Sequence, residues 1–261
     1  MRLIFLALFS FNIFAQDLAW DRENSCPVGD MAFVEKVLSE MTVEEKVGQT
    51  IMADLDFIKP VDLRRYPIGG ILNGGNTSPN GNQQASTDEW KSLAQDFYEE
   101  SIKTGSNIPI LWGTDAVHGH SNVLGATIFP HNIGLGASAN EQLLEAIGAA
   151  VAEEVLATGL YWTFAPTVTV PQDYRWGRTY EGYSESPELV SKLGESFIYG
   201  LQGKGDEFLK SNKIIGTAKH FLGDGGTYLG VDQGDTKVDE KTLKDIHGTP
   251  YYSALDACIQ T

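Results

Sequence analysis

The stretch IPILWGTDAVHGHSNVLGATIFPHNIGLGAS, Ile108–Ser138, decides how the rest of the chain is interpreted. It begins with a short apolar run that ends at Trp112, a pattern typical of a buried strand in a parallel sheet. Asp115 closes this predicted strand, and glycines, histidines and asparagines follow it. In a barrel of parallel strands, ligands are held where the strands end. We therefore expect the functional groups of this chain at strand ends.

Elsewhere in the chain, apolar runs typical of strands alternate with segments in which apolar residues have helical spacing. Runs typical of strands occur at five places: Gly48–Ala53, Pro67–Leu72, Ile108–Asp115, Leu160–Val170 and Ile214–Ala218. Helical spacing of apolar residues separates them, and each predicted helix has a polar residue that can cap its start. These caps are Asp30, Thr42 with Glu45, Ser86 with Glu89, Ser138 with Glu141, Ser186 and Asp239, and Gly105 and Gly159 are expected to end two of the helices.

The alternating order predicts an α/β protein whose parallel sheet is covered by helices. No GxGxxG motif follows the first strand, which argues against a dinucleotide-binding fold and a nucleotide cofactor. The pattern favours a (β/α)8 TIM-type barrel that is incomplete in this chain, with about five of the eight strands. The sequence stops at Thr261 within a predicted helix, so a truncated barrel is expected.

The N-terminus is typical of a secretory signal. Arg2 precedes the apolar run Leu3–Phe14, and Ala15 is a small residue suited to cleavage. The run is too short to span a bilayer, so a cleaved signal is favoured over a membrane anchor. We therefore expect residues 1–16 to be removed as a signal peptide and residues 17–261 to form the N-terminal part of the barrel domain. The protein is then expected to be periplasmic or extracellular, without a membrane attachment after cleavage.

Charge and cysteine content limit the partners. The net charge of −16 disfavours nucleic acid and anionic membranes, whereas a neutral ligand such as a sugar is compatible with it. Cys26 and Cys258 are too few for a disulfide scaffold, and both a single bridge and two free thiols remain open. The oligomeric state is not predicted.

Four residues at or just beyond strand ends are the candidate ligand-binding groups: Asp115, Arg178, Lys219 and His220. Adjacent hydroxyls of a hexose both donate and accept, so a carboxylate together with cationic donors can hold them. Each residue also has a structural interpretation. Asp115 could cap a helix, and Lys219 with His220 could be a satisfied pair in the core.

The other histidines carry less signal. His118 and His120 have the spacing of a metal-ligand pair, but no third ligand lies at a sensible distance in the sequence, so no metal is expected. His118 and His131 are interpreted as hydrogen-bonded groups around the site. Asn76-Thr77-Ser78 matches the weak pattern of an N-glycosylation acceptor.

Four blocks of the sequence, in order, resemble the N-terminal barrel domain of glycoside hydrolase family 3, in its β-glucosidase and exo-β-glucanase branch. These blocks are MTVEEKVGQ (Met41–Gln49), DAVHGHSNVLGATIFPHNIGLG (Asp115–Gly136), RWGRTYEGYSE (Arg175–Glu185) and AKHFLGDGGT (Ala218–Thr227).

The resemblance implies a retaining, exo-acting hydrolase that removes terminal β-D-glucosyl residues from β-glucans or cello-oligosaccharides, with no cofactor. It also implies that the residues matching Asp115, Arg178, Lys219 and His220 bind glucose in the −1 subsite. The family's nucleophile is an aspartate in a Ser-Asp-Trp block, which this sequence does not contain. That aspartate and a glutamate acid/base are therefore expected beyond Thr261, and the chain by itself is expected to be inactive.

Two alternatives remain at this stage. The β-N-acetylhexosaminidase branch of the same family carries a Pro-Gly-His-Gly loop where this chain has Leu222–Gly226, which favours the glucosidase branch. The other alternative is a non-catalytic protein that binds sugar without turning it over. Linkage preference and aglycone are not predicted.

Overall fold

The computed structural model describes residues 26, 27 and 29–261, so the predicted signal segment lies outside the described residues. Four parallel strands form one sheet in chain order: β1 (Met52–Asp54), β2 (Gly70–Asn73), β3 (Leu111–Thr114) and β4 (Trp162–Thr163). The register pairs Asn73 with Thr114, and Thr114 with Thr163. Because all these pairs are parallel, the carboxyl ends of the strands lie at one edge of the sheet.

The predicted fifth strand, Ile214–Ala218, is wrong as a regular strand, because this segment lies beside β4 but pairs with that part of the chain only through isolated bridges. Ile215 bridges to Trp162, and its N–H donates to the carbonyl of Tyr161 at 2.8 Å. A second bridge joins Lys219 to Thr167. The predicted fourth strand, Leu160–Val170, is wrong in length, because only two of its residues form regular strand. Pro166, which has no N–H to donate to a neighbouring strand, lies in its middle.

Eight α-helices accompany the strands within the described part of the chain. They are α1 (Met31–Glu40), α2 (Val43–Gly48), α3 (Thr87–Ser101), α4 (Asn132–Ser138), α5 (Glu141–Ala157), α6 (Pro187–Gln202), α7 (Glu240–Thr242) and α8 (Thr249–Asp256). A π-helical turn, Leu243–Gly248, joins α7 to α8. Short 3-10 turns occur at Leu55–Phe57, Pro60–Arg64, Pro79–Gly81, Thr179–Glu181, Gly205–Glu207, Asp224–Gly226 and Tyr228–Gly230.

Most predicted helix starts are confirmed by their hydrogen bonds. The Asp30 carboxylate accepts from the N–H of Phe33 at 3.0 Å, and both predicted capping boxes form at α2 and α3. The Ser186 hydroxyl accepts from the N–H of Leu189. Each cap satisfies a backbone donor that the first helical turn leaves without a partner.

Several predicted boundaries are wrong, including the starts of the second and third strands, which begin at Gly70 and Leu111. Asn140, not Ser138, caps α5, since Ser138 belongs to α4 and its hydroxyl donates to the carbonyl of Leu135. The helix α3 ends at Ser101, before Gly105, and the N–H groups of Lys103 and Thr104 then bond to carbonyls three residues earlier, as in a turn. The first strand begins at Met52, as Gly48 still belongs to α2.

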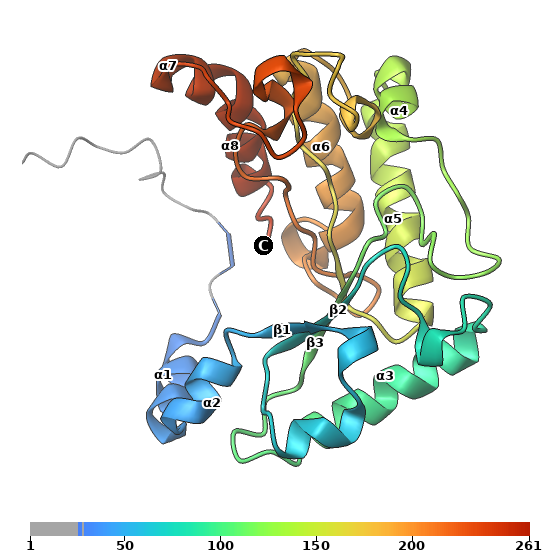
Figure 1. The fold of residues 1–261 in the computed structure, drawn as a ribbon, viewed down its shortest axis with the longest axis vertical. Coiled ribbons are helices and arrows are strands. Elements are labelled where there is room, and N and C mark those ends of the chain that lie inside the picture. Colours follow the sequence, from blue (N-terminus) through green and yellow to red (C-terminus); the bar gives the residue numbers. More distant parts are fainter. Residues whose placement is uncertain (1–25, 28) are drawn as a thin grey trace, which may run out of the picture.

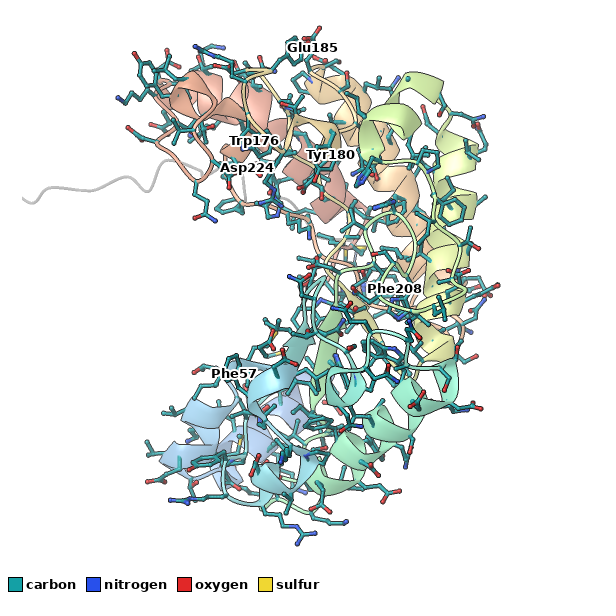
Figure 2. The ribbon with its side chains drawn as sticks, turned by 45° about the vertical axis from the view of Figure 1, so that its right-hand side comes forward. Phe57, Trp176, Tyr180, Glu185, Phe208 and Asp224 are labelled. Carbon is teal, nitrogen blue, oxygen red and sulfur yellow. A yellow bond between two sulfur atoms is a disulfide. The ribbon has the colours of Figure 1, made fainter. Side chains whose placement is uncertain are left out.

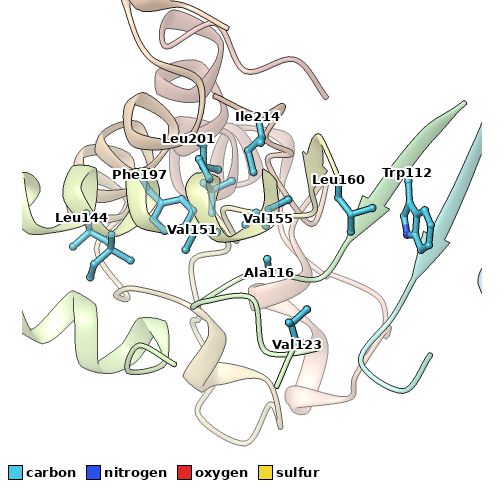
Figure 3. Close-up of a cluster of buried hydrophobic side chains, with 14 of the residues drawn as sticks. Trp112, Ala116, Val123, Leu144, Val151, Val155, Leu160, Phe197, Leu201 and Ile214 are labelled. Atoms are coloured by element: carbon cyan, nitrogen blue, oxygen red, sulfur yellow. The ribbon is translucent and has the colours of Figure 1, made fainter. Parts of the chain in front are cut away.

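The main core lies where α5 packs on α6. Figure 3 shows Leu144, Val151 and Val155 of α5 facing Phe197 and Leu201 of α6, all of them fully buried. The two backbones approach closely at Gly148 and Gly200: a Cβ added to Gly200 would lie 2.2 Å from the carbonyl oxygen of Glu145. Residues of both helices share one hydrophobic core with Ile71 of β2 and Trp112 of β3.

The described chain forms an open crescent, with β1, α1 and α2 on one arm and α7 and α8 on the other (Figures 1 and 2). A disulfide joins Cys26, just before α1, to Cys258, just after α8, which decides between the two states left open by the sequence. Among the described residues, no helix is both long enough and apolar enough to cross a membrane.

We predict that Gly200→Ala lowers the free energy of unfolding by about 2 kcal/mol or more, because the new methyl group must push α6 away from the α5 backbone. Urea denaturation followed by circular dichroism measures the change. Gly74→Ala is the matched control, as an added Cβ there meets nothing within 4 Å and should cost less than about 0.5 kcal/mol. Equal losses for the two variants would contradict the close helix contact.

Candidate functional site

A polar pocket of about 350 Å³ opens at the carboxyl ends of the strands. Three of the four predicted site residues line it: Asp115, Arg178 and Lys219. The rest of the lining comes from the segments that follow β2, β3 and β4, including the start of α4 and the 3-10 turn Thr179–Glu181; these residues are Gly75, Val117, His118, Ser121, His131, Asn132, Tyr180 and Glu181. The structure thus brings three of the four predicted residues together in one pocket, and their role in binding a ligand stays a prediction.

Asp115 and Lys219 form an ion pair across the pocket floor. The distance from Lys219 Nζ to Asp115 Oδ1 is 2.8 Å, although the residues are 104 positions apart in the sequence. Asp115 follows β3 directly, and the bridge to Thr167 fixes the backbone at Lys219. The Lys219 ammonium has two further hydrogens that can be donated. In the described part of the chain, the Asp115 carboxylate accepts no other hydrogen bond. The pair can therefore offer both donors and an acceptor to a ligand.

Arg178 is held from two sides. Its Nε and Nη2 donate to the two carboxylate oxygens of Glu181, at 2.7 and 2.8 Å. This bidentate pair raises the pKa of the guanidinium above its ordinary value. The same Nη2 lies 3.0 Å from Nε2 of His220. His220 is not among the residues that line the pocket; among the described residues, its side chain is hydrogen-bonded to one lining residue, Arg178.

His220 has a second partner on its other ring nitrogen. Its Nδ1 lies 2.8 Å from Oδ2 of Asp224, the first residue of a 3-10 turn. The other Asp224 oxygen, Oδ1, accepts from the Thr169 hydroxyl at 2.7 Å and from the N–H of Gly225 at 3.0 Å. Figure 2 shows Asp224 and Tyr180 on the same arm of the crescent.

An aromatic wall lines one side of the pocket. The rings of His118 and His131 lie 3.9 Å apart, and His131 meets Tyr180 edge-on at 4.6 Å. His118 Nδ1 donates to the carbonyl of Phe129 at 2.7 Å. Burial, with a smaller contribution from neighbouring His118, lowers the pKa of His131 below its ordinary value. This wall presents ring faces and edges rather than fixed charge to the pocket.

His120 points away from the pocket into the core. The Thr158 hydroxyl donates to the carbonyl of Val155, so it accepts from Nε2–H of His120 at 3.1 Å. His120 Nδ1 finds no partner among the described residues, and burial lowers the pKa of this imidazole from 6.5 to about 4. His118 and His120 therefore face different surroundings, and no group of three or more potential metal ligands occurs among residues 26, 27 and 29–261.

Two partners of the predicted residues were not assigned from the sequence. Glu181 holds Arg178, and Asp224 holds His220. Each acidic residue lies three or four positions after the cation or imidazole that it binds, so the short spacing was the available signal. An additional polar residue, Asn132, donates to the carbonyl of Glu181 at 2.7 Å and fixes the turn that carries it.

The fold and the pocket together are those of an α/β barrel domain whose ligand site lies at the carboxyl ends of its strands. Residues 42–261 match the model of the glycosyl hydrolase family 3 N terminal domain. The chain belongs to this family, and its sheet and helices are part of the family's TIM-type barrel.

Similar proteins support this assignment. The structure resembles exo-1,3/1,4-beta-glucanase (ExoP) from a Pseudoalteromonas species, with a TM-score of 0.87 and 49% identity over 91% of this chain and 30% of that chain. The lysosomal beta glucosidase of Dictyostelium discoideum is 28% identical over 81% of this chain and 28% of that protein. The periplasmic beta-glucosidase of Salmonella typhimurium is 30% identical over 87% of this chain and 28% of that protein. The chain thus spans less than a third of the length of these relatives.

We predict that acid destabilises the wild-type chain more than a His120→Gln variant. Unfolded histidine binds a proton near pH 6.5, whereas buried His120 does so only near pH 4, so stability is lost as the pH falls between these values. The difference between the two proteins should reach up to about 3 kcal/mol at pH 4. Urea denaturation at pH 8, 6, 5 and 4 measures it.

The pH 8 curves give the baseline cost of the replacement, since His120 is neutral there in both states. Wild-type and variant stabilities that fall in parallel with pH would contradict the buried, neutral state of His120.

Proposed function

We propose that this chain is the N-terminal part of a retaining, exo-acting β-glucosidase, and that its pocket is the −1 subsite for a terminal β-D-glucosyl residue. The carrying observation is the convergence of Asp115, Lys219 and Arg178 on one pocket of about 350 Å³. The family membership and the similarity to glucosidases and an exo-glucanase support the same substrate class.

The chemistry of the pocket suits a neutral polyol. Lys219 and Arg178 supply fixed donors, Asp115 supplies an acceptor, and each charge already has a counter-charge within hydrogen-bond distance. Vicinal hydroxyls can therefore replace water on these groups without bringing net charge into the site. The ring wall of His118 and Tyr180 offers an apolar surface for the face of a sugar ring.

The carboxylates of this pocket are arranged for binding a sugar, not for cleaving a glycosidic bond. A retaining glycosidase needs two carboxyl groups about 5–5.5 Å apart, one as nucleophile and one as acid/base. Asp115 and Glu181 are the carboxylates among the residues lining this pocket, and each is paired with a cation. We therefore assign Asp115 to holding the glycone and Glu181 to holding Arg178, and we propose that the nucleophile and the acid/base come from outside this pocket.

The paired state of both carboxylates is also the observation that favours the second candidate, a protein that binds sugar without turnover. The two functions differ in one measurable property. A β-glucosidase expressed from the complete reading frame hydrolyses an aryl β-glucoside, whereas a binding protein retains glucose affinity and gives no product.

We further propose that the protein is exported. The signal-like residues 1–16 favour export, and a disulfide between Cys26 and Cys258 is stable in an oxidising compartment outside the cytoplasm. The similarity to a periplasmic beta-glucosidase supports the same location.

We predict that Asp115→Asn lowers kcat/KM on an aryl β-glucoside by at least about 3 kcal/mol, more than about 100-fold, in the enzyme expressed from its complete reading frame. The replacement removes a charged acceptor from the sugar and leaves Lys219 without its counter-charge. Steady-state kinetics measures the loss.

Asp54→Asn is the matched control, since Asp54 also ends a strand but, among the described residues, its carboxylate accepts only from the nearby backbone N–H of Asp56. It should change kcat/KM less than about threefold. A loss below about twofold for Asp115→Asn would show that this carboxylate has a structural role only.

We predict that the exported protein begins near residue 16 or 17, because a signal with Arg2, an apolar middle and Ala15 is cleaved just after its small residue. N-terminal sequencing of protein recovered from the periplasm or the medium gives the cleavage site. Soluble cytoplasmic protein that retains Met1 would refute the assignment.

A further inference from the structure

The hydrogen bonds of His220 permit one arrangement of its ring protons. A guanidinium has only donors, so Arg178 Nη2 must donate to His220 Nε2, which therefore carries a lone pair. The ring proton of neutral His220 then lies on Nδ1 and is donated to Oδ2 of Asp224. Both bonds are made at once only in this tautomer.

This tautomer determines which part of Arg178 is left for a ligand. Its Nε donates to Glu181, and the two hydrogens of Nη2 are shared between Glu181 and His220. No hydrogen bond within the described part of the chain uses Nη1. The guanidinium is thus fixed along one edge by three bonds, and Nη1 is the donor that remains available in the pocket.

Asp224 is itself held in one orientation. Its Oδ1 accepts from two donors, the Thr169 hydroxyl and the N–H of Gly225. Thr169 is 3% exposed, and a Cβ on Gly225 would lie 2.5 Å from the carbonyl oxygen of Val170, so the turn has little room to move. Only Oδ2 of this carboxylate is directed to His220.

We propose that Asp224 is a positioning residue that fixes the Nδ1–H tautomer of His220, and through it the orientation of Arg178 toward the sugar. The inference rests on the proposed sugar-binding function of the pocket. Within the described part of the chain, Asp224 has no hydrogen bond to a residue that lines the pocket; it acts through His220, which acts through Arg178.

The replacement Asp224→Asn tests this proposal because it keeps the shape and exchanges one acceptor for a donor. The amide oxygen should stay on the N–H of Gly225, since the reverse orientation would place two donors against each other. The amide NH2 then faces His220 Nδ1, which must accept, and the ring proton moves to Nε2. Two donors would then face each other at the Arg178 contact, now 3.0 Å long, and the guanidinium should move. The same substitution in a serine-protease triad leaves the geometry intact but sets the wrong histidine tautomer.

The experiment uses the 261-residue chain labelled with 15N-histidine and long-range 1H–15N correlation spectra, in which the two tautomers give distinct nitrogen shifts. His220→Gln identifies the His220 signals among the five histidines. D-glucose titration followed by the same spectra measures affinity. Asp235→Asn, a carboxylate on the loop after Asp224, is the matched control.

We expect His220 to be the Nδ1–H tautomer in the wild type and in Asp235→Asn. In Asp224→Asn we expect the Nε2–H tautomer, together with at least about a tenfold weaker affinity for glucose. Nε2–H in the wild type would overturn the proposal even if the variant fails to fold. Unchanged tautomer and affinity in a folded Asp224→Asn variant would overturn it as well. Wild-type protein that shows Nδ1–H but binds no glucose would instead contradict the proposed function and leave the role of Asp224 in fixing the tautomer supported.

Discussion

The ion pair between Asp115 and Lys219 connects two segments that are far apart in the sequence. Asp115 directly follows β3, and Lys219 lies beside the segment after β4. The pocket depends on this link. The ion pair forms because parallel strands end at one edge, so that residues 104 positions apart meet at 2.8 Å. The register of β2, β3 and β4 sets that edge, and the packing of α5 on α6 holds the strands in place behind it.

Around this ion pair, the other charged side chains of the site also have hydrogen-bonding partners. Arg178 is matched by Glu181, and Asp224 is matched by donors from Thr169, Gly225 and His220. A buried charge without a partner is costly, so these partners allow ionic groups to stay ordered in a partly buried pocket. The resulting site has directed donors and acceptors but little unbalanced charge, which agrees with a neutral sugar as ligand.

The fold class could be predicted because it depends on local patterns that the sequence repeats: apolar runs, helical spacing and caps such as Thr42 and Ser86. Boundaries were harder, since Asn140 competes with Ser138 for the cap of α5 and only the packed structure decides between them. Asp115 could be placed at the carboxyl edge of the sheet because it directly follows β3, whereas Arg178 enters the same pocket from the start of a 3-10 turn well after β4. The position of His220 behind Arg178 could not be predicted, because it depends on how two loops meet.

Glu181 and Asp224 were missed as partners for a related reason: a carboxylate three or four residues from a cation is common on any turn, and only the backbone conformation shows which such pairs close. The pairing of Cys26 with Cys258 is likewise a three-dimensional fact, since 232 residues separate them.

A crystal structure of this chain with D-glucose tests the role of the pocket most directly. We predict one glucose molecule in the pocket, with its hydroxyls within hydrogen-bond distance of the Asp115 carboxylate, Lys219 Nζ and Arg178 Nη1, and with the Arg178–His220 contact retained. Glucose bound elsewhere on the molecule, with this pocket open to solvent and filled only by water, would contradict that role.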